Sequence, residues 1–311
     1  MRAISQDTLG GPEVLKTVEV DRPEPGPTEV LVRVRAAGVN PTDWKHRTNG
    51  GLLGPPPFTL GWDVSGVVEA VGLGTTIHKP GDEVFGMLRY PLGHGAYAEY
   101  VTAPARHFAR KPAGIDHVHA AAIPLAALTA WQALVDTAGV RAGSRVLVHA
   151  AAGGVGHFAV QIAKARGAHV IGTASAAKHD FLRGLGADEL VDYRAQDFAE
   201  VVRGVDAVID TMGGDYGPRS LRTLREGGTI VSLTLSLLDP GLDEEAARRG
   251  IRSAAMLVEP DHAALRALVA LAEADRLRSE IAAVLPLADA AKAHELGESG
   301  HTTGKIVLTV P

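Results

Sequence analysis

The feature that most constrains this chain is an alternation of short apolar segments with helical segments after about residue 120. We predict strands over 145–150, 169–173, 206–210 and 229–233. Helices are predicted between the first of these strands, over 155–166 and 177–185. Strands that alternate with helices at this spacing are typical of βαβ units, whose strands pair in parallel. This part of the chain is therefore predicted to be an α/β fold with a parallel sheet.

A glycine-rich turn joins the first predicted strand to the first predicted helix. Its pattern is Ala151-x-Gly153-x-x-Gly156, a variant of the dinucleotide fingerprint in which alanine replaces the first glycine. Glycines there let backbone amides approach a pyrophosphate, and the helix N-terminus adds unpaired N–H groups and a positive dipole end. We predict that the turn binds a dinucleotide through Ala152, Gly153, Gly154 and Val155; the alternative is a glycine-rich turn that binds nothing.

The next predicted strand indicates which dinucleotide. NAD sites usually carry an acidic residue about 20 residues after the glycines. This chain has Gly172-Thr173-Ala174-Ser175 instead, with no carboxylate before Asp180. Ser175 can donate to a phosphate oxygen and Lys178 can add a positive charge, so NADP (NADPH) is the predicted cofactor. The alternatives are a helix-capping role for Ser175 and a solvated surface position for Lys178.

The first third of the chain is predicted to be rich in β-strands. Val30, Val32 and Val34 alternate with other residues at the period of a strand, and glycines divide the β-branched stretch 64–72. A helix is predicted over 261–278 with Asp261 as its N-cap. The apolar tail 304–310 has no following helix, so we expect it to return to the first domain. The predicted domains are therefore 1–120 with 280–311, and 121–279.

Composition excludes several classes of protein. The 311 residues include no cysteine, which rules out disulfides, thiolate nucleophiles and cysteine-ligated zinc, and is compatible with a cytoplasmic location. A net charge of −5 argues against nucleic acid as a partner. The most apolar stretch, 118–135, contains Pro124 and is mostly alanine, so no membrane span is predicted. Two histidines, His117 and His119, are weak as a metal site because no third ligand is in view.

Several motifs in this order resemble a known family. They are Ala36-Ala37-Gly38-Val39-Asn40-Pro41-Thr42-Asp43-Trp44-Lys45, Gly61-Trp62-Asp63-Val64-Ser65-Gly66, Gly93-His94-Gly95-Ala96-Tyr97-Ala98-Glu99-Tyr100, Pro124-Leu125-Ala126-Ala127-Leu128-Thr129, the glycine turn, Leu185-Gly186-Ala187-Asp188 and Gly304-Lys305-Ile306-Val307. The chain resembles zinc-independent medium-chain dehydrogenases/reductases of the NADPH:quinone oxidoreductase type.

The resemblance implies an α/β protein with a GroES-like β-barrel catalytic domain and a Rossmann cofactor domain. It also implies roles for residues that patterns alone do not assign. Tyr193 would lie near the 2′-phosphate of the adenosine, although a strand-end aromatic is an equal alternative. Thr129, Ser232 and Leu233 would lie near the nicotinamide.

The resemblance bears on metal binding as well. Asn40 and Trp62 stand where the alcohol dehydrogenase branch has a zinc-binding cysteine and histidine, so no metal site is predicted. Without a Lewis acid to stabilise an alkoxide, alcohol oxidation loses its usual support. Reduction of an activated acceptor remains, with hydride passing from NADPH to a quinone or an α,β-unsaturated carbonyl (enone). Asn40 and Lys45 are the candidate catalytic residues, because donors aimed at the carbonyl oxygen lower the barrier; a solvated lysine is the alternative for Lys45.

Two other functions stay open at this point. One is an enoyl-thioester or 2-enal reductase of a biosynthetic pathway, and the other is a non-catalytic NADPH-binding sensor. No Ser-His-Asp arrangement is predicted, because Gly-x-Ser-x-Gly is absent. A homodimer is expected, since the apolar stretch 251–258 would be a costly open sheet edge.

Overall fold

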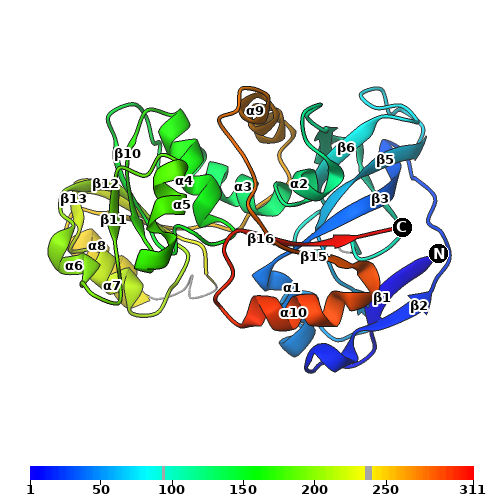
Figure 1. Cartoon of the computed structure of the whole chain (residues 1–311), viewed down its shortest axis with the longest axis horizontal. Helices are drawn as coiled ribbons and strands as arrows, with labels where there is room; N and C mark the ends of the chain where they lie inside the picture. Colours follow the sequence, from blue (N-terminus) through cyan, green and yellow to red (C-terminus); the bar gives the residue numbers. More distant parts are fainter. Residues whose placement is uncertain (93–94, 235–239) are drawn as a thin grey trace. The chain divides into compact units, whose positions relative to one another are not determined.

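The structure is a computed structural model that describes residues 1–92, 95–234 and 240–311 (Figure 1). Gly93 and His94 of the resembling motifs lie outside these residues. The chain divides into two compact units: unit 1 comprises Met1–Leu128 and Glu259–Pro311, and unit 2 comprises Thr129–Val258. The predicted boundaries after residues 120 and 279 differ from these divisions.

Unit 1 contains mostly antiparallel β-structure. Its strands are β1 (Arg2–Gln6), β2 (Lys16–Glu19), β3 (Glu29–Val39), β4 (Phe58–Thr59), β5 (Asp63–Val71), β6 (Glu83–Met87), β7 (Tyr100–Pro104), β8 (Phe108–Arg110), β15 (Ile281–Pro286) and β16 (Lys305–Thr309). The larger sheet has the order β15-β16-β3-β5-β6-β8, with β7 also pairing β3, and the smaller one the order β2-β1-β4. Glycine at position 66 is required where β5 pairs with β3, because a Cβ there would lie 2.1 Å from the carbonyl oxygen of Arg33.

The predicted return of the tail to the first domain is confirmed. β16 pairs antiparallel with β3, with Ile306 opposite Val39 and Thr309 opposite Ala36, and parallel with β15. The helical segments of unit 1 are η1 (Pro12–Val14), α1 (Pro41–Asn49), η2 (Ala105–His107), α2 (His117–Ala121), α9 (His262–Glu273), η5 (Leu287–Asp289) and α10 (Ala290–Glu298).

Helix α9 lies in unit 1, whereas the sequence placed it in the cofactor domain. Its N-cap is Asp261, as predicted: the carboxylate accepts from the amides of Ala263 and Ala264. Next to the cap, Nδ1 of His262 lies 2.9 Å from the carbonyl oxygen of Phe108 in β8. This contact and the packing on β8 tie the helix to the sheet of unit 1, a partner that helical periodicity does not specify.

Unit 2 contains the predicted parallel sheet. Its strands are β9 (Arg145–Val148), β10 (His169–Thr173), β11 (Glu189–Val191), β12 (Val205–Asp210), β13 (Leu224–Ser232) and β14 (Arg252–Ala255). All neighbours pair in parallel in the order β11-β10-β9-β12-β13-β14. Its helical segments are η3 (Gln132–Thr137, a π-helix), α4 (Gly156–Ala165), η4 (Ala176–Lys178), α5 (His179–Gly184), α6 (Phe198–Val201), α7 (Tyr216–Ser220) and α8 (Pro240–Arg248). Helix α3 (Pro124–Trp131) spans the division between the units.

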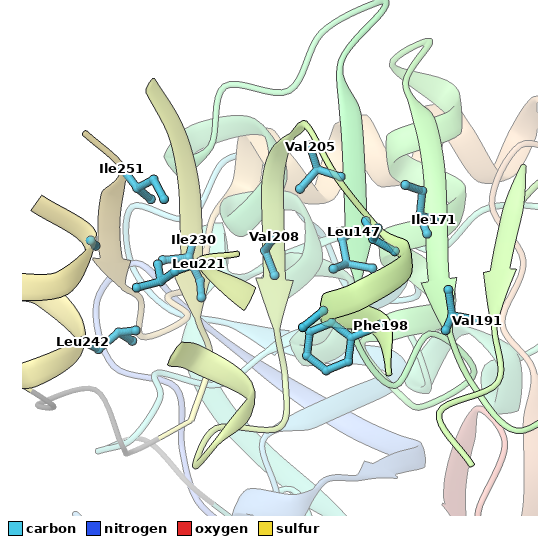
Figure 2. Packing of buried hydrophobic residues seen from close by; sticks show 13 residues of the cluster. Leu147, Ile171, Val191, Phe198, Val205, Val208, Leu221, Ile230, Leu242 and Ile251 are labelled. Carbon is cyan, nitrogen blue, oxygen red and sulfur yellow. The ribbon is translucent and has the colours of Figure 1, made fainter. Parts of the chain in front are cut away.

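β-Branched residues and leucines form a hydrophobic core on one face of this sheet. Leu147, Ile171, Val208 and Ile230 occupy matching positions in four neighbouring strands and are fully buried. Figure 2 shows these side chains in one row, with Phe198 of α6 packed against them. Because α4 packs on β9 and β10 outside this cluster, helices cover both faces of the sheet, which is the doubly wound arrangement.

No helix among the described residues is both long and apolar enough to cross a membrane. The stretch 118–135 is divided among α2, α3 and η3.

Candidate functional site

The glycine turn lies at the carboxyl end of β9, the edge where parallel sheets bind ligands. The chain leaves the strand through Ala150, whose φ of 45° is in the left-handed region that non-glycine residues rarely adopt. The amide of Gly153 donates to the carbonyl oxygen of Ala150 at 2.8 Å and closes the turn. Strand and helix are thus joined by a tight, hydrogen-bonded loop.

Close packing explains the glycines of this turn. A Cβ on Gly156 would lie 2.3 Å from the carbonyl oxygen of Ala150, so the first residue of α4 has to be glycine. A Cβ on Gly172 of β10 would lie 2.9 Å from Cβ of Ala151, so the neighbouring strand also leaves room for the turn. A Cβ on Gly153 would lie 3.1 Å from the carbonyl oxygen of Ala150, which is a less severe contact.

Three backbone amides of the turn are available to bind an anion. Within the described part of the chain, the N–H groups of Ala152, Gly154 and Val155 have no hydrogen-bond acceptor. They precede the N-terminus of a ten-residue helix, which carries a partial positive charge. Unpaired N–H groups at a helix start are the arrangement that binds phosphate. The residues present therefore fit the pyrophosphate of a nicotinamide dinucleotide.

A buried histidine that the sequence analysis missed supports the same turn. His149 is fully buried, with Nε2 2.9 Å from the hydroxyl of Ser220 and Nδ1 3.2 Å from the hydroxyl of Thr173. The Thr173 hydroxyl also accepts from the amide of Ala150. Burial lowers the pKa of His149 to about 3, with Arg219 adding to the effect, so the ring is neutral at physiological pH. A histidine directly after an apolar strand was the available signal.

The predicted 2′-phosphate residues lie at the next two strand ends. Ser175 precedes η4 as its N-cap residue, but its side chain makes no capping hydrogen bond, so the capping alternative is not what the structure shows. Lys178 ends η4. Tyr193 follows β11 with a side chain that is 47% exposed, and the guanidinium of Arg194 lies 5.7 Å from its ring centre.

The predicted nicotinamide residues belong to unit 2. Ser232 ends β13 and is 7% exposed, and its backbone oxygen accepts from Met256. The amide of Leu233 donates to the carbonyl oxygen of Asp210, so both residues lie at the carboxyl edge of the sheet. Thr129 is buried in α3.

The two candidate catalytic residues of unit 1 are placed very differently. Asn40 is 1% exposed, and its amide is occupied at both ends: Nδ2 donates to Asp63 at 2.8 Å, and Oδ1 accepts from Lys305. These contacts place Asn40 in an internal network, and its role as a donor to substrate stays a prediction. Lys45 is exposed on α1.

That network surrounds a buried ion pair. Nζ of Lys305 lies 3.4 Å from Oδ2 of Asp63 and 2.9 Å from the carbonyl oxygen of Val39. The other carboxylate oxygen of Asp63 accepts from the amide of Leu125 at 2.6 Å. Burial raises the pKa of Asp63, with Lys305 and its hydrogen-bond donors opposing the rise. A lysine within the apolar segment 305–308 was the missed signal.

Asp43 continues the buried polar chain. Its Oδ2 accepts from the amide of Asn40 at 2.7 Å and from the hydroxyl of Tyr97 at 2.9 Å, and it thereby caps α1. Oδ1 has no partner in the described part of the chain. Burial raises the pKa of Asp43 to about 7. These contacts give Asp43 a structural role at the start of α1.

A serine, a histidine and a glutamate that the sequence did not connect do come together in unit 1. The Ser65 hydroxyl lies 2.8 Å from Nδ1 of His117, whose Nε2 lies 3.3 Å from Glu83. Ser65 is fully buried in β5, so no substrate can reach its hydroxyl. His119 pairs with Asp116 instead. Among the described residues, no group of three or more metal-ligating His, Cys, Asp or Glu side chains occurs.

Comparisons with known proteins match two family models to the chain. The family model "Alcohol dehydrogenase GroES-like domain" matches residues 26–113, and the model "Zinc-binding dehydrogenase" matches residues 185–308. The chain is 36% identical to a 2-haloacrylate reductase of Burkholderia sp, over 96% of each chain.

Quinone oxidoreductases are among the solved structures that cover the whole chain. The quinone oxidoreductase from Coxiella burnetii is 40% identical, with a TM-score of 0.94 over 100% of this chain and 99% of that one. The quinone oxidoreductase of Escherichia coli, solved in complex with NADPH, is 31% identical with a TM-score of 0.90 over 100% of both chains.

Fold and glycine turn together define a two-domain oxidoreductase that uses a nicotinamide cofactor. More narrowly, the chain belongs to the medium-chain dehydrogenase/reductase superfamily, in its quinone oxidoreductase-like group.

Proposed function

We propose that this protein reduces a quinone or an α,β-unsaturated carbonyl with NADPH, without a catalytic zinc. The observation that carries the proposal is the set of unpaired amides of Ala152, Gly154 and Val155 ahead of α4. Bound NADPH supplies the hydride. The names of the relatives, quinone oxidoreductase and 2-haloacrylate reductase, support both acceptor classes equally.

The preference for NADPH over NADH rests on Ser175, Lys178 and Tyr193. The Ser175 hydroxyl makes no capping bond, and neither β10 nor the residues up to 179 supply a carboxylate that would bind the ribose hydroxyls. Lys178→Glu, which places a negative charge beside the 2′-phosphate, is expected to raise the KM for NADPH about tenfold and leave that for NADH unchanged. Arg183→Glu, a nearby charge reversal on α5, is the control. An unchanged preference in Lys178→Glu contradicts the assignment.

Zinc independence rests on the residues themselves. Trp62 has no metal-binding atom, the Asn40 amide is engaged with Asp63 and Lys305, and the chain has no cysteine. The test is activity after chelation together with metal analysis: full activity at substoichiometric zinc supports the proposal. If chelation abolishes activity and added zinc restores it, zinc independence is contradicted.

For the reaction itself, the chain has to bind the acceptor and stabilise charge on its oxygen. Lys45 is the proposed cationic residue, because its side chain is exposed on α1 in the catalytic unit. The decisive assay follows the absorbance of NADPH with a panel of quinones, enals and enoyl thioesters. Oxidation with thioesters alone favours the biosynthetic alternative, and stabilisation by NADPH without any oxidation favours the sensor.

A homodimer is proposed from the sheet edge of unit 2. β14 pairs only with β13 among the described strands, and Leu257, just beyond it, is 46% exposed. The edge of β14 that does not face β13 can pair with a second copy of this chain. A monomer mass in light scattering at micromolar concentration overturns this. A cytoplasmic location is likewise proposed, from the cysteine-free composition alone.

A further inference from the structure

A buried histidine on α4, His157, contacts the glycine turn with its side chain. Its ring is fully buried, and Nδ1 lies 2.9 Å from the backbone oxygen of Gly153, four residues earlier. Because a carbonyl oxygen only accepts, Nδ1 carries the hydrogen. The backbone amide of His157 donates to the same oxygen at 3.1 Å. Two donors from the first turn of the helix therefore hold the Gly153 carbonyl group.

The planar peptide bond links this contact to the amide of the next residue. The peptide between Gly153 and Gly154 is trans, so its C=O and its N–H point in opposite directions. The oxygen of Gly153 points towards α4, and the N–H of Gly154 therefore points away from the helix, ahead of its N-terminus. That N–H is one of the three amides of the turn that lack an acceptor in the described part of the chain. It lies where a helix N-terminus binds phosphate.

A peptide between two glycines needs such a contact more than its neighbours do. Glycine adopts positive and negative φ about equally readily, so side chains do not prevent the Gly153–Gly154 peptide from rotating by half a turn. After that rotation, the oxygen of Gly153 would face the phosphate site in place of the Gly154 hydrogen. The peptide before Gly153 is held by its own hydrogen bond, because its N–H donates to the oxygen of Ala150. The imidazole of His157 gives the Gly–Gly peptide a side-chain donor that opposes the rotation.

We propose that His157 is a positioning residue for cofactor binding. Its Nδ1–H holds the Gly153 carbonyl group and thereby keeps the N–H of Gly154 directed at the pyrophosphate of the dinucleotide. The inference rests on the proposed function, and the turn, α4 and both glycines belong to unit 2. Because His157 acts through the backbone, its loss weakens the affinity for phosphate groups and leaves the chemical step of hydride transfer unchanged.

The test compares two substitutions of nearly the same shape. Asn and Leu share the same branching, but only Asn can place an N–H donor where Nδ1 of the histidine lies. His157→Leu is expected to weaken the binding of inorganic pyrophosphate and of NADPH about fivefold, in line with the loss of one hydrogen bond. His157→Asn is expected to restore both affinities to within about twofold of the wild type. Calorimetric titration measures each ligand.

The control for a general loss of stability is His78→Leu. Nε2 of this buried histidine also lies near backbone oxygens, 3.2 Å from those of Ala105 and Phe108, but in unit 1. This variant should bind pyrophosphate and NADPH as the wild type does. In turnover, His157→Leu should raise the KM for NADPH and leave kcat at saturating NADPH unchanged.

A spectroscopic measurement separates the orientation of the peptide from packing and needs no cofactor. With isotopically labelled glycine, the amide signal of Gly154 in the ligand-free protein should have the same chemical shift in the wild type and His157→Asn, and a different one in His157→Leu. Pyrophosphate should move this signal in the wild type. An unchanged Gly154 signal in His157→Leu, or equal weakening of pyrophosphate binding in the Leu and Asn variants, overturns the inference. Wild-type protein that binds pyrophosphate with the expected pattern but oxidises no NADPH overturns the proposed function instead.

Discussion

Lys305 is a buried cation. The buried carboxylate of Asp63 balances its charge. Lys305→Met leaves that carboxylate buried without its counter-charge, which is expected to destabilise unit 1 by about 3–5 kcal/mol. In the double variant Lys305→Met/Asp63→Asn the charge is gone from both sides, and the Asn40 amide can turn to accept from Asn at 63. We expect the double variant to recover about 1–3 kcal/mol in urea unfolding. Strictly additive effects would contradict the pairing.

Asp43 gives stability a specific pH dependence. Its pKa is about 7 in the folded protein against 3.8 for an ordinary aspartate, so the folded state holds the proton more tightly. The contribution to stability is therefore full below about pH 4 and is lost as pH rises towards 7, by about 1.4 kcal/mol per pH unit. Asp43→Asn cannot ionise and imitates the protonated form. The Tm of this variant minus that of the wild type should rise between pH 5 and 8; a difference that does not depend on pH contradicts the prediction.

At the scale of elements, the turn between β9 and α4 depends on one glycine more than on the others. Gly156→Ala forces a Cβ to within 2.3 Å of a carbonyl oxygen, so the turn has to shift together with its unpaired amides. We expect the Kd for NADPH to rise at least about tenfold, because the amides no longer converge on the phosphates. Gly114→Ala is the matched control, since a Cβ there meets nothing within 4 Å. Titration of the fluorescence of bound NADPH measures both, and equal affinity would remove the turn from the binding site.

Most strands and the glycine turn could be predicted because their signals are local. Alternation of Val30, Val32 and Val34 marks β3, and the spacing of Gly153 and Gly156 marks the start of α4. What could not be predicted depends on which segments meet: Lys305 lies beside Asp63, 242 residues away in the sequence, and both side chains contact Asn40. The phenol of Tyr90 and the hydroxyl of Thr42, 48 residues apart, are a second case.

At the scale of the whole molecule, the proposed cofactor turn and the buried ion pair belong to different units. Ala152, Gly154 and Val155 lie in unit 2, and Lys305 with Asp63 in unit 1. NADPH at 100 times its Kd stabilises the state that binds it by about 2.7 kcal/mol. Hydrogen exchange with NADPH should therefore show new protection at the amides of 152–156 and at 173–178. Protection that appears in unit 1 while these amides exchange as before would place the cofactor elsewhere.

The position of β16 between β15 and β3 has a consequence for the order in which the chain folds during synthesis. Unit 2 is one continuous segment and is fully synthesised before the last strands of unit 1. It can therefore fold while translation continues. Unit 1 has to wait, because its central β3 lacks one neighbour, and Asp63 its counter-ion, until residues 305–309 emerge. The sheet of unit 1 is therefore still incomplete when unit 2 has been synthesised. During this interval β3 exposes an unpaired strand edge that a chaperone can shield.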